Sequence, residues 1–297
     1  MTWRGWTAFA ALGLIWGVPY LLVKLAVPEL SPLVIAWGRV ALGTVVLLPI
    51  AWKRGALRSL GQHKAALFAF AVVEFVVPFS MIALGERWVS SSVTGILIAT
   101  VPLSVVLLAR FFGIREHLGS WRLTGLAVGF IGVVALLGLG TISGVLGWAG
   151  VACMLLASVG YATGPLIIQR HLKGLDAFGP LAASLLIATV VLLVPALLTS
   201  PKQLPTALAL SSVVVLGIVC TALAMLLMFY LVNHAGASRA SLITYINPAV
   251  ATLLGVWLLD EHLGAGGITA FALILLGSWL ASRGARQAVG AGREGEI

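Results

Sequence analysis

Long apolar runs joined by short polar connections are the feature that most restricts how this chain can fold. Counting the runs between charged residues and Pro or Gly breaks gives ten segments, each near the length of roughly 20 residues that a helix needs to cross a bilayer. They lie at about 6–27, 32–52, 65–84, 88–111, 121–139, 146–168, 177–198, 209–232, 238–259 and 265–282. We therefore expect an all-α integral membrane protein with ten transmembrane helices.

The composition agrees with a polytopic membrane protein. Hydrophobic residues make up 61% of the 297 residues and charged residues only 9%, whereas soluble domains carry about 25% charged residues. The excess of 18 Lys and Arg over 9 Asp and Glu does not indicate nucleic-acid binding, because the basic residues sit in the short loops. Cys153 and Cys220 fall within apolar runs and are interpreted as reduced packing residues.

The placement of the basic residues predicts how the chain is oriented in the membrane. With the N-terminus in the cytosol, fourteen Lys and Arg residues fall in cytoplasmic segments, and only Arg87 and Lys202 fall in outer loops. This asymmetry is the positive-inside pattern. We expect a protein of the bacterial cytoplasmic (inner) membrane with both termini in the cytoplasm.

Sequence features of the first half of the chain recur in the second half at a nearly constant offset. Pro248 follows Pro102 by 146 positions, and the sequence EHLG at 261–264 follows the same four letters at 116–119 by 145 positions. Sequence similarity at an offset of half the chain length indicates an internal duplication, in which each copy is half of the protein.

The duplication predicts two five-helix repeats, one at 1–140 and the other at 141–297. Because five is an odd number of spans, the two repeats must cross the membrane in opposite directions. Inverted repeats are an architecture of secondary transporters, in which the substrate site lies near the midplane between the halves.

These features together resemble a known family. The ten spans in two inverted groups, the mirrored prolines, the EHLG sequence before a Gly-rich helix in both halves, and the opening LGLIWGVPYLLVK at 12–24 are similar to the drug/metabolite transporter superfamily, EamA type. Within that family the chain is most similar to the bacterial aromatic amino acid exporters called YddG. The resemblance covers essentially the whole chain, and its motifs specify the fold far better than the substrate.

Prolines inside the spans are the first candidates for a transport site. Pro78, Pro102 and Pro248 each free a backbone carbonyl at membrane depth, which must face protein, a polar side chain or water. The resulting bends could open a cavity and offer polar backbone to a substrate, or they could only shape helix packing.

Charged residues inside the spans are the second candidates. Glu74 and Arg39 lie at similar depth on consecutive spans, and a charge near the bilayer centre is usually functional because it is costly to bury. Glu74 could hold a proton or the amino group of a substrate; alternatively, Arg39 and Glu74 could pair and fix the bundle. Lys24, nearer a span end, is expected to extend outward toward Glu29.

Aromatic and hydrogen-bonding residues away from the span ends are the third candidates. Trp and Tyr at span ends are usually interfacial anchors, but Trp16, Tyr161 and Tyr245 lie deeper. With nearby polar residues they could line a cavity, although some of the group could instead serve helix packing. A lining of this kind suits a neutral or zwitterionic ligand with a flat apolar side chain. The group consists of Trp16, Tyr20, Ser80, Thr94, Thr100, Tyr161, Tyr245 and Asn247.

Small residues on the fifth span predict close helix packing. Gly125, Gly129 and Gly132 are spaced by four and three positions, which places them on one helix face. The fifth and tenth spans could pack together as a scaffold, or this face could meet a second protomer.

Several kinds of site find no support in the sequence. The chain has no glycine-rich phosphate loop with a following lysine, its five histidines do not form a metal-binding set, and no serine has a base and an acid placed to activate it. We therefore expect no cofactor, no metal and no enzymatic activity.

Two transport hypotheses remain open. The first is a secondary transporter that exports aromatic or neutral amino acids, or similar small metabolites, by alternating access. The alternative is a proton-coupled multidrug exporter of lipophilic cations, which requires Glu74 to be unpaired and to face the cavity. In both hypotheses the partners are a small-molecule substrate and the lipid bilayer, and a monomer and a homodimer are both compatible with the sequence.

Overall fold

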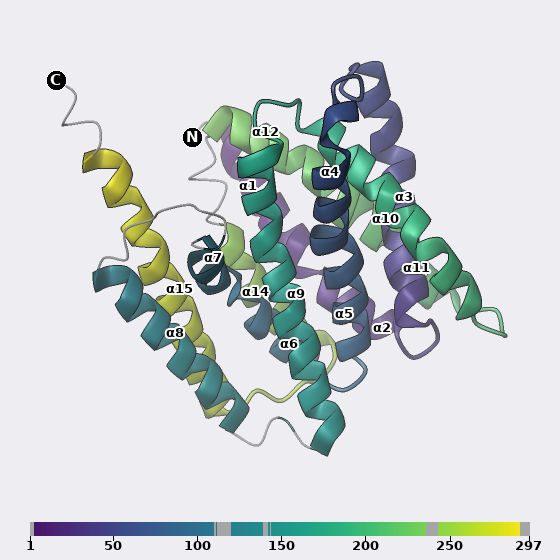
Figure 1. Ribbon diagram of the computed structural model, residues 1–297. Coiled ribbons are helices and arrows are strands. Elements are labelled where there is room, and N and C mark those ends of the chain that lie inside the picture. Colours follow the sequence, from purple (N-terminus) through teal and green to yellow (C-terminus); the bar gives the residue numbers. More distant parts are fainter. Residues whose placement is uncertain are drawn as a thin grey trace.

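Helices form every regular element in the part of the chain that the structure describes. The computed structural model describes residues 3–109, 111, 120–138, 142, 144–235 and 243–291 (Figure 1). The prediction of an all-α membrane protein is confirmed for these residues. The first EHLG sequence, at 116–119, lies outside them.

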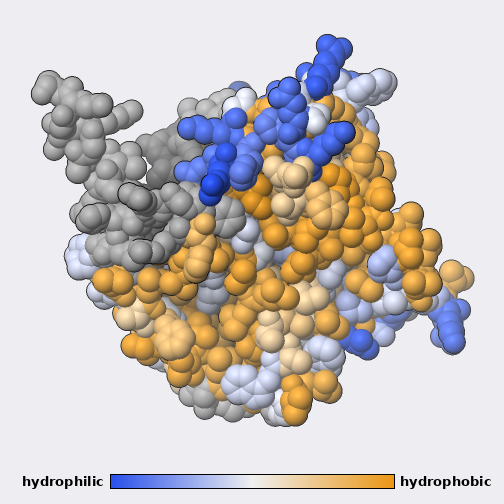
Figure 2. All heavy atoms as spheres, in the orientation of Figure 1, coloured by the Kyte–Doolittle hydropathy of each residue, from blue (hydrophilic) through white to orange (hydrophobic). Residues whose placement is uncertain are grey.

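In the described part of the chain, seven helical segments are long and apolar enough to cross a membrane: Trp3–Ala26, Pro32–Lys53, Leu60–Gly85, Ser91–Leu108, Gly144–His171, Phe178–Leu198 and Ala207–Met228. Shorter apolar helices occupy the positions predicted for the fifth, ninth and tenth spans: Leu123–Leu137, Ile246–Leu258 and Ala265–Leu280. The outer surface agrees with a lipid environment, since Figure 2 shows an apolar band across the middle of the molecule and hydrophilic residues gathered at one end.

Some of the predicted spans are single helices, and others consist of several helical segments. The single helices are α3 (Pro32–Lys53), α8 (Ser120–Gly138), α9 (Gly144–His171), α10 (Phe178–Leu198), α14 (Ile243–Leu258) and α15 (Ala265–Ala291). The segmented spans are α1 (Trp3–Gly17) with α2 (Pro19–Ala26); η1 (Leu60–His63), α4 (Lys64–Ala71), η2 (Val72–Val76) and α5 (Val77–Gly85); α6 (Ser91–Ile98) with α7 (Val101–Ala109); and α11 (Ala207–Gly217), η3 (Ile218–Leu223) and α12 (Ala224–Ala235).

The mirrored prolines have different effects on their helices. Pro102 stands at the start of α7, directly after a break at Ala99 and Thr100, whereas Pro248 lies inside the continuous helix α14. Pro248 and Ala251 instead face Gly95 of α6, so this part of α14 is a packing surface.

Helices α8 and α15 pack against each other at one side of the bundle (Figure 1). A Cβ atom on Gly277 would collide with the backbone of Gly129 and lie 2.6 Å from the Gly125 carbonyl oxygen, and a Cβ atom on Gly132 would lie 2.8 Å from the backbone nitrogen of Ile274. These glycines let the two backbones touch, so the predicted close packing of the fifth and tenth spans occurs within one chain.

Counterpart positions of the two halves contact each other. Ile274 and Gly277 stand 145 positions after Gly129 and Gly132, and the contacts between the two pairs are reciprocal. The hydroxyls of Thr44 and Thr189, also 145 positions apart, lie 3.0 Å from each other where α3 packs on α10. The π-helical segments η2 and η3 begin 146 positions apart. Contacts of this reciprocal kind are those that a two-fold axis generates.

Replacing Gly277 with Ala tests the contact between α8 and α15. The added methyl group meets backbone atoms that cannot turn aside, so we expect a loss of about 1–3 kcal/mol in the free energy of unfolding, measured by denaturation in detergent micelles. The matched control is Gly264→Ala, because nothing lies within 4 Å of a Cβ atom there. Equal stability of the two variants would contradict the close contact.

Candidate functional site

A cavity of about 230 Å³ lies between α1, η2, α9, α10 and α12. Its lining is mainly apolar, with aromatic rings and two thioethers. Glu74 is the one ionisable side chain among the described residues that line it. The other lining residues include Trp16, Phe70, Phe75, Pro165, Leu181, Met225 and Met228. An apolar cavity with a single polar group is typical of small-molecule sites.

Glu74 lies on the π-helical segment η2, a type of helix irregularity that often marks functional sites. Its Oε2 atom is buried and has no hydrogen-bond partner. Glycines of α9 make room for this segment, since a Cβ atom on Gly164 would collide with Oε2, and one on Gly160 would lie 2.5 Å from the Val73 carbonyl oxygen. Pro78 follows at the start of α5, and its Cγ atom would lie 2.9 Å from the same Cβ atom on Gly160.

Arg39 is held by the second half of the chain. Its side chain is buried, and its Nε donates a hydrogen bond of 2.9 Å to the hydroxyl of Thr221 on η3, which in turn donates to the Leu216 carbonyl oxygen. The guanidinium carbon lies 3.7 Å from the centroid of the Phe79 ring. A cation over an aromatic face is attracted by the ring quadrupole, and this contact partly replaces the water that Arg39 has lost.

The structure does not contain the predicted Arg39–Glu74 ion pair. Among the described residues, the ion pair within 4 Å joins Arg54 and Asp176, at 3.3 Å and near the surface. Each of the two membrane-depth charges therefore has its own environment, in which Arg39 bonds to a hydroxyl and Glu74 faces the cavity.

Two of the predicted tyrosines lie close to these charges without lining the cavity. Tyr161 on α9 is within electrostatic range of both Arg39 and Glu74, and Tyr20 on α2 is within range of Arg39. Both side chains pack against apolar clusters. The two tyrosines therefore form the protein wall beside the charged groups in this conformation.

The predicted polar residues of the fourth span close the gap between α6 and α7. The Leu97 carbonyl oxygen accepts hydrogen bonds from the hydroxyls of Thr100 (2.6 Å) and Ser158 (3.2 Å), and the Ala99 carbonyl oxygen accepts one from Ser278 (2.9 Å). These carbonyls therefore have protein partners at the break beside Pro102, as membrane burial requires. Thr94 likewise bonds within its own turn, to the Ser90 carbonyl oxygen at 3.0 Å.

The remaining predicted site residues are distributed over other helices. The Ser80 hydroxyl and the Asn247 Oδ1 atom are buried without hydrogen-bond partners. The Asn247 carbonyl oxygen approaches Gly17, at the break between α1 and α2. The side chain of Tyr245 lies outside the described part of the chain.

The structure thus places two of the predicted residues, Trp16 and Glu74, on the cavity wall. The sequence reasoning missed Phe70, Met225 and Met228. Phe70 precedes Glu74 by four residues, and the two methionines are three apart, so helical spacing could have placed each pair on one face.

The predicted partner of Lys24, Glu29, is wrong. Its Nζ donates to the backbone carbonyl oxygens of Glu86 (2.6 Å) and Val89 (2.8 Å) and not to Glu29. The Glu29 carboxylate accepts hydrogen bonds from the backbone nitrogen and hydroxyl of Thr206, at 2.6 and 2.7 Å. These bonds lower the pKa of Glu29 below its ordinary value.

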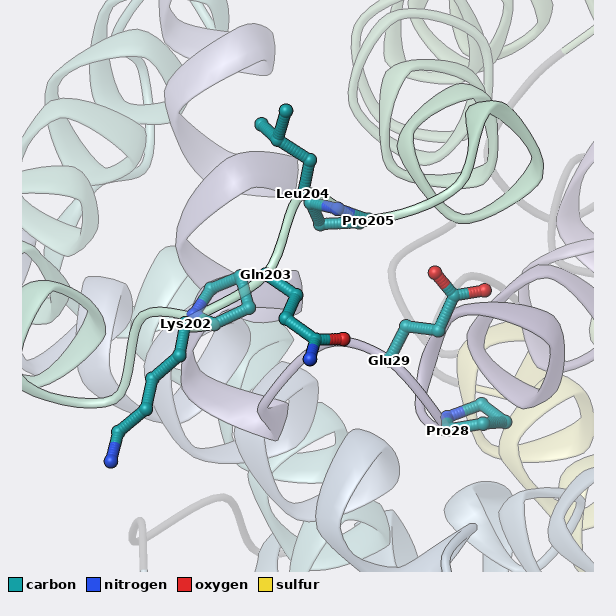
Figure 3. Close-up of a pocket in the computed structure, with 7 residues that line it drawn as sticks. Pro28, Glu29, Lys202, Gln203, Leu204 and Pro205 are labelled. Atoms are coloured by element: carbon teal, nitrogen blue, oxygen red, sulfur yellow. The ribbon is translucent and has the colours of Figure 1, made fainter.

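A second hollow, of about 390 Å³, lies between the loop after α2 and the loop before α11 (Figure 3). Pro28 and Glu29 line one side of it, and residues 201–205 line the other. It belongs to connecting loops outside the apolar spans, so we do not assign the membrane-depth site to it. Among the described residues, no group of three or more His, Cys, Asp or Glu side chains could hold a metal ion.

Comparisons with known proteins agree with these features. The profile of the EamA-like transporter family matches residues 3–138 and again 148–283. The chain is 30% identical over 287 residues to the uncharacterized inner membrane transporter YedA of Escherichia coli (strain K12), covering 92% of this chain and 91% of that protein. It is 23% identical to the uncharacterized transporter YoaV of Bacillus subtilis (strain 168), covering 90% and 92%. A solved crystal structure matches 96% of this chain and 98% of its own with a TM-score of 0.67 and 20% identity, which shows a shared fold.

Replacing Thr221 with Val tests how Arg39 is held. Valine keeps the shape of threonine but leaves the Nε–H group of Arg39 buried without an acceptor, so we expect a loss of about 1.5–3 kcal/mol in the free energy of unfolding, measured in detergent micelles. The control is Thr163→Val, because that exposed hydroxyl bonds only to the Val159 carbonyl oxygen of its own helix. A loss no larger than that of the control would refute this role for Thr221.

Proposed function

Because this chain belongs to the EamA-like transporter family, within the drug/metabolite transporter superfamily, and is a multi-pass transporter of the bacterial inner membrane, we propose that it exports small organic molecules that combine an apolar body with an amino group. Aromatic and neutral amino acids are the leading substrates of this kind. The proposal includes cytoplasmic termini and no enzymatic reaction.

The cavity around Glu74 carries this proposal. A carboxylate oxygen buried without a hydrogen-bond donor, as Oε2 of Glu74 is, is costly, and a positively charged ligand would lower that cost. The aromatic rings of Trp16, Phe70 and Phe75 and the adaptable thioethers of Met225 and Met228 suit a flat apolar body beside the amino group.

Arg39 supports amino acids as the substrate class. Its guanidinium carries a positive charge at similar depth, and no described carboxylate lies within ion-pair distance of it. A zwitterion would place its amino group at Glu74 and its carboxylate toward Arg39, and Tyr161 lies within electrostatic range of both. In this proposal the transported molecule connects two charges that the protein keeps apart.

Alternating access between two inverted five-helix repeats is the proposed mechanism. The double match of the family profile and the reciprocal contacts between counterpart positions support two related halves. Ten spans and two repeats of opposite orientation would place the cavity at the junction of the halves, where rocking exposes it to one side at a time.

Lipophilic cations are the second candidate class. The observation that favours them is the lining itself, because no Lys or Arg is among the described residues that line the cavity. A ligand that carries a positive charge but no carboxylate could then bind in the cavity through Glu74 alone. During the return step, a proton would take the place of that ligand on Glu74.

Transport by the purified protein in proteoliposomes tests both classes. We expect uptake of labelled Phe or Trp, and a fall of at least about tenfold in the Glu74→Gln variant, since removing one partner of a buried charge pair costs about 2–5 kcal/mol. Glu29→Gln is the matched control, because Glu29 binds Thr206 outside the cavity.

The comparison substrates are Thr and a lipophilic cation, each measured with and without an imposed pH gradient. Cation uptake that the gradient drives, without amino acid uptake, would replace the first class by the second. Full activity of Glu74→Gln toward every substrate would contradict a role for this carboxylate in either class.

A further inference from the structure

A second buried carboxylate lies far from the cavity, at the junction of α5 and α6. Glu86 directly follows α5, its side chain is 0% exposed, and neither of its carboxylate oxygens has a hydrogen-bond partner. The hydroxyl of Thr94 lies beside it but donates its proton to the Ser90 carbonyl oxygen. This junction is at the end of the bundle opposite to the start of α1 (Figure 1).

Lys24 reaches the same junction from α2. Its ammonium group donates to the backbone carbonyl oxygens of Glu86 and Val89 and makes no ion pair with the Glu86 carboxylate within 4 Å. Lys24 therefore ties α2 to the loop between α5 and α6 without neutralising Glu86 by direct contact.

Glu261 approaches from the other half of the chain. Its carboxylate accepts hydrogen bonds from the backbone nitrogens of Ser91 (2.7 Å) and Ser92 (2.8 Å) and from the Ser92 hydroxyl (2.6 Å). An acceptor with a negative charge is favourable at the N-terminus of a helix, here α6. Asp260, in the left-handed region at φ 52°, turns the chain so that Glu261 can reach this position.

The remaining groups around Glu86 are weakly acidic. Tyr20 stands one turn before Lys24 on α2 and lies within electrostatic range of Glu86. Cys153 of α9 packs against Gly85, the residue before Glu86. Lys24 is thus the one cation among the described groups that face Glu86.

The charge balance of this cluster depends on one proton. With Glu86 ionised, two carboxylates and one ammonium lie in one cluster, and the buried Glu86 carboxylate lacks any donor; with Glu86 protonated, the cluster is neutral. Burial raises the pKa of Glu86 well above its ordinary value, the Lys24 ammonium opposes that rise, and the Glu261 carboxylate adds to it.

We propose that Glu86, Lys24 and Glu261 form a proton-operated lock that holds this end of the bundle closed while Glu86 is protonated. Opening admits water to the carboxyl group, its O–H bond breaks, the proton passes to that water, and the carboxylate that remains is hydrated. Closing takes one proton back from the same side. The proposal rests on the proposed alternating access, because it describes how one of the two ends opens.

The direction of the pH effect follows from proton linkage. The closed state binds one proton more than the open state, so acid at this face favours the closed state and alkaline conditions favour the open state. Between the Glu86 pKa values of the two states, the ratio of open to closed molecules changes about tenfold per pH unit.

Thiol labelling measures this opening without any substrate. In a background in which Cys153 and Cys220 are replaced by Ala, Ala251→Cys places a reporter on α14, buried against Gly95 of α6. A membrane-impermeant maleimide is applied at this face over a range of pH. Labelling is normalised to Gln203→Cys, an exposed position at which thiol chemistry alone sets the rate.

We expect normalised labelling of the Ala251→Cys reporter to rise with pH, by up to about tenfold per unit through the transition. Adding Glu86→Gln, which mimics the protonated acid, should keep labelling slow at every pH. Adding Glu29→Gln should leave the parent profile unchanged, because that carboxylate is exposed and lies outside the cluster.

Two results would overturn the lock. A flat profile in the reporter protein with Glu86 intact would show that no proton is linked to opening, and it needs no further variant to fold. A Glu86→Gln protein that elutes as a folded species and keeps the parent profile would assign the pH effect to another group. Because the readout uses no substrate, failure to transport amines and failure of the lock are separate outcomes.

Discussion

Backbone carbonyl and amide groups at membrane depth must find partners inside the protein, and the arrangement of these helices depends on that constraint. Where α6 ends before α7, the buried carbonyl oxygens of Leu97 and Ala99 accept hydrogen bonds from the hydroxyls of Thr100 in the same span, Ser158 of α9 and Ser278 of α15. The break of the helix is tolerated because two other helices, α9 and α15, meet it and Thr100 at the break supplies a third donor. The same contacts fix α6 against its neighbours, and α6 carries the residues that Glu261 caps.

Glycines, which have no side chain, leave space for neighbouring segments to approach closely. Gly160 and Gly164 let α9 approach η2, and this approach sets the position of Glu74 at the cavity. Gly129 and Gly277 bring α8 and α15 into backbone contact away from the cavity. Packing in lipid gains little from burial of apolar surface, so van der Waals contact between small residues has a large share in holding such a bundle together.

The ionisable side chains of Arg39, Glu74 and Glu86 have different surroundings, and each environment suits a different role. Arg39 bonds to Thr221 and rests on Phe79, which fixes it between the halves. Glu74 has an oxygen without a partner beside a cavity, and Glu86 has two at the junction of α5 and α6. The two acids at different depths suit a transporter in which one group meets the substrate and the other responds to the proton at the membrane surface.

The sequence alone determined the membrane class and the positions of the apolar helices, because hydropathy and length are local properties, and it predicted the repeat from an offset of about 145 residues. It also identified Glu74 as unusual. Only the tertiary structure decided that Arg39 bonds to Thr221 and not to Glu74, that Lys24 bonds to the carbonyl oxygens of Glu86 and Val89, and that methionines of α12 line the cavity. The physical reason is that a long side chain at a given depth can reach several neighbours, and helix rotation and crossing, which packing sets, determine which neighbour it meets.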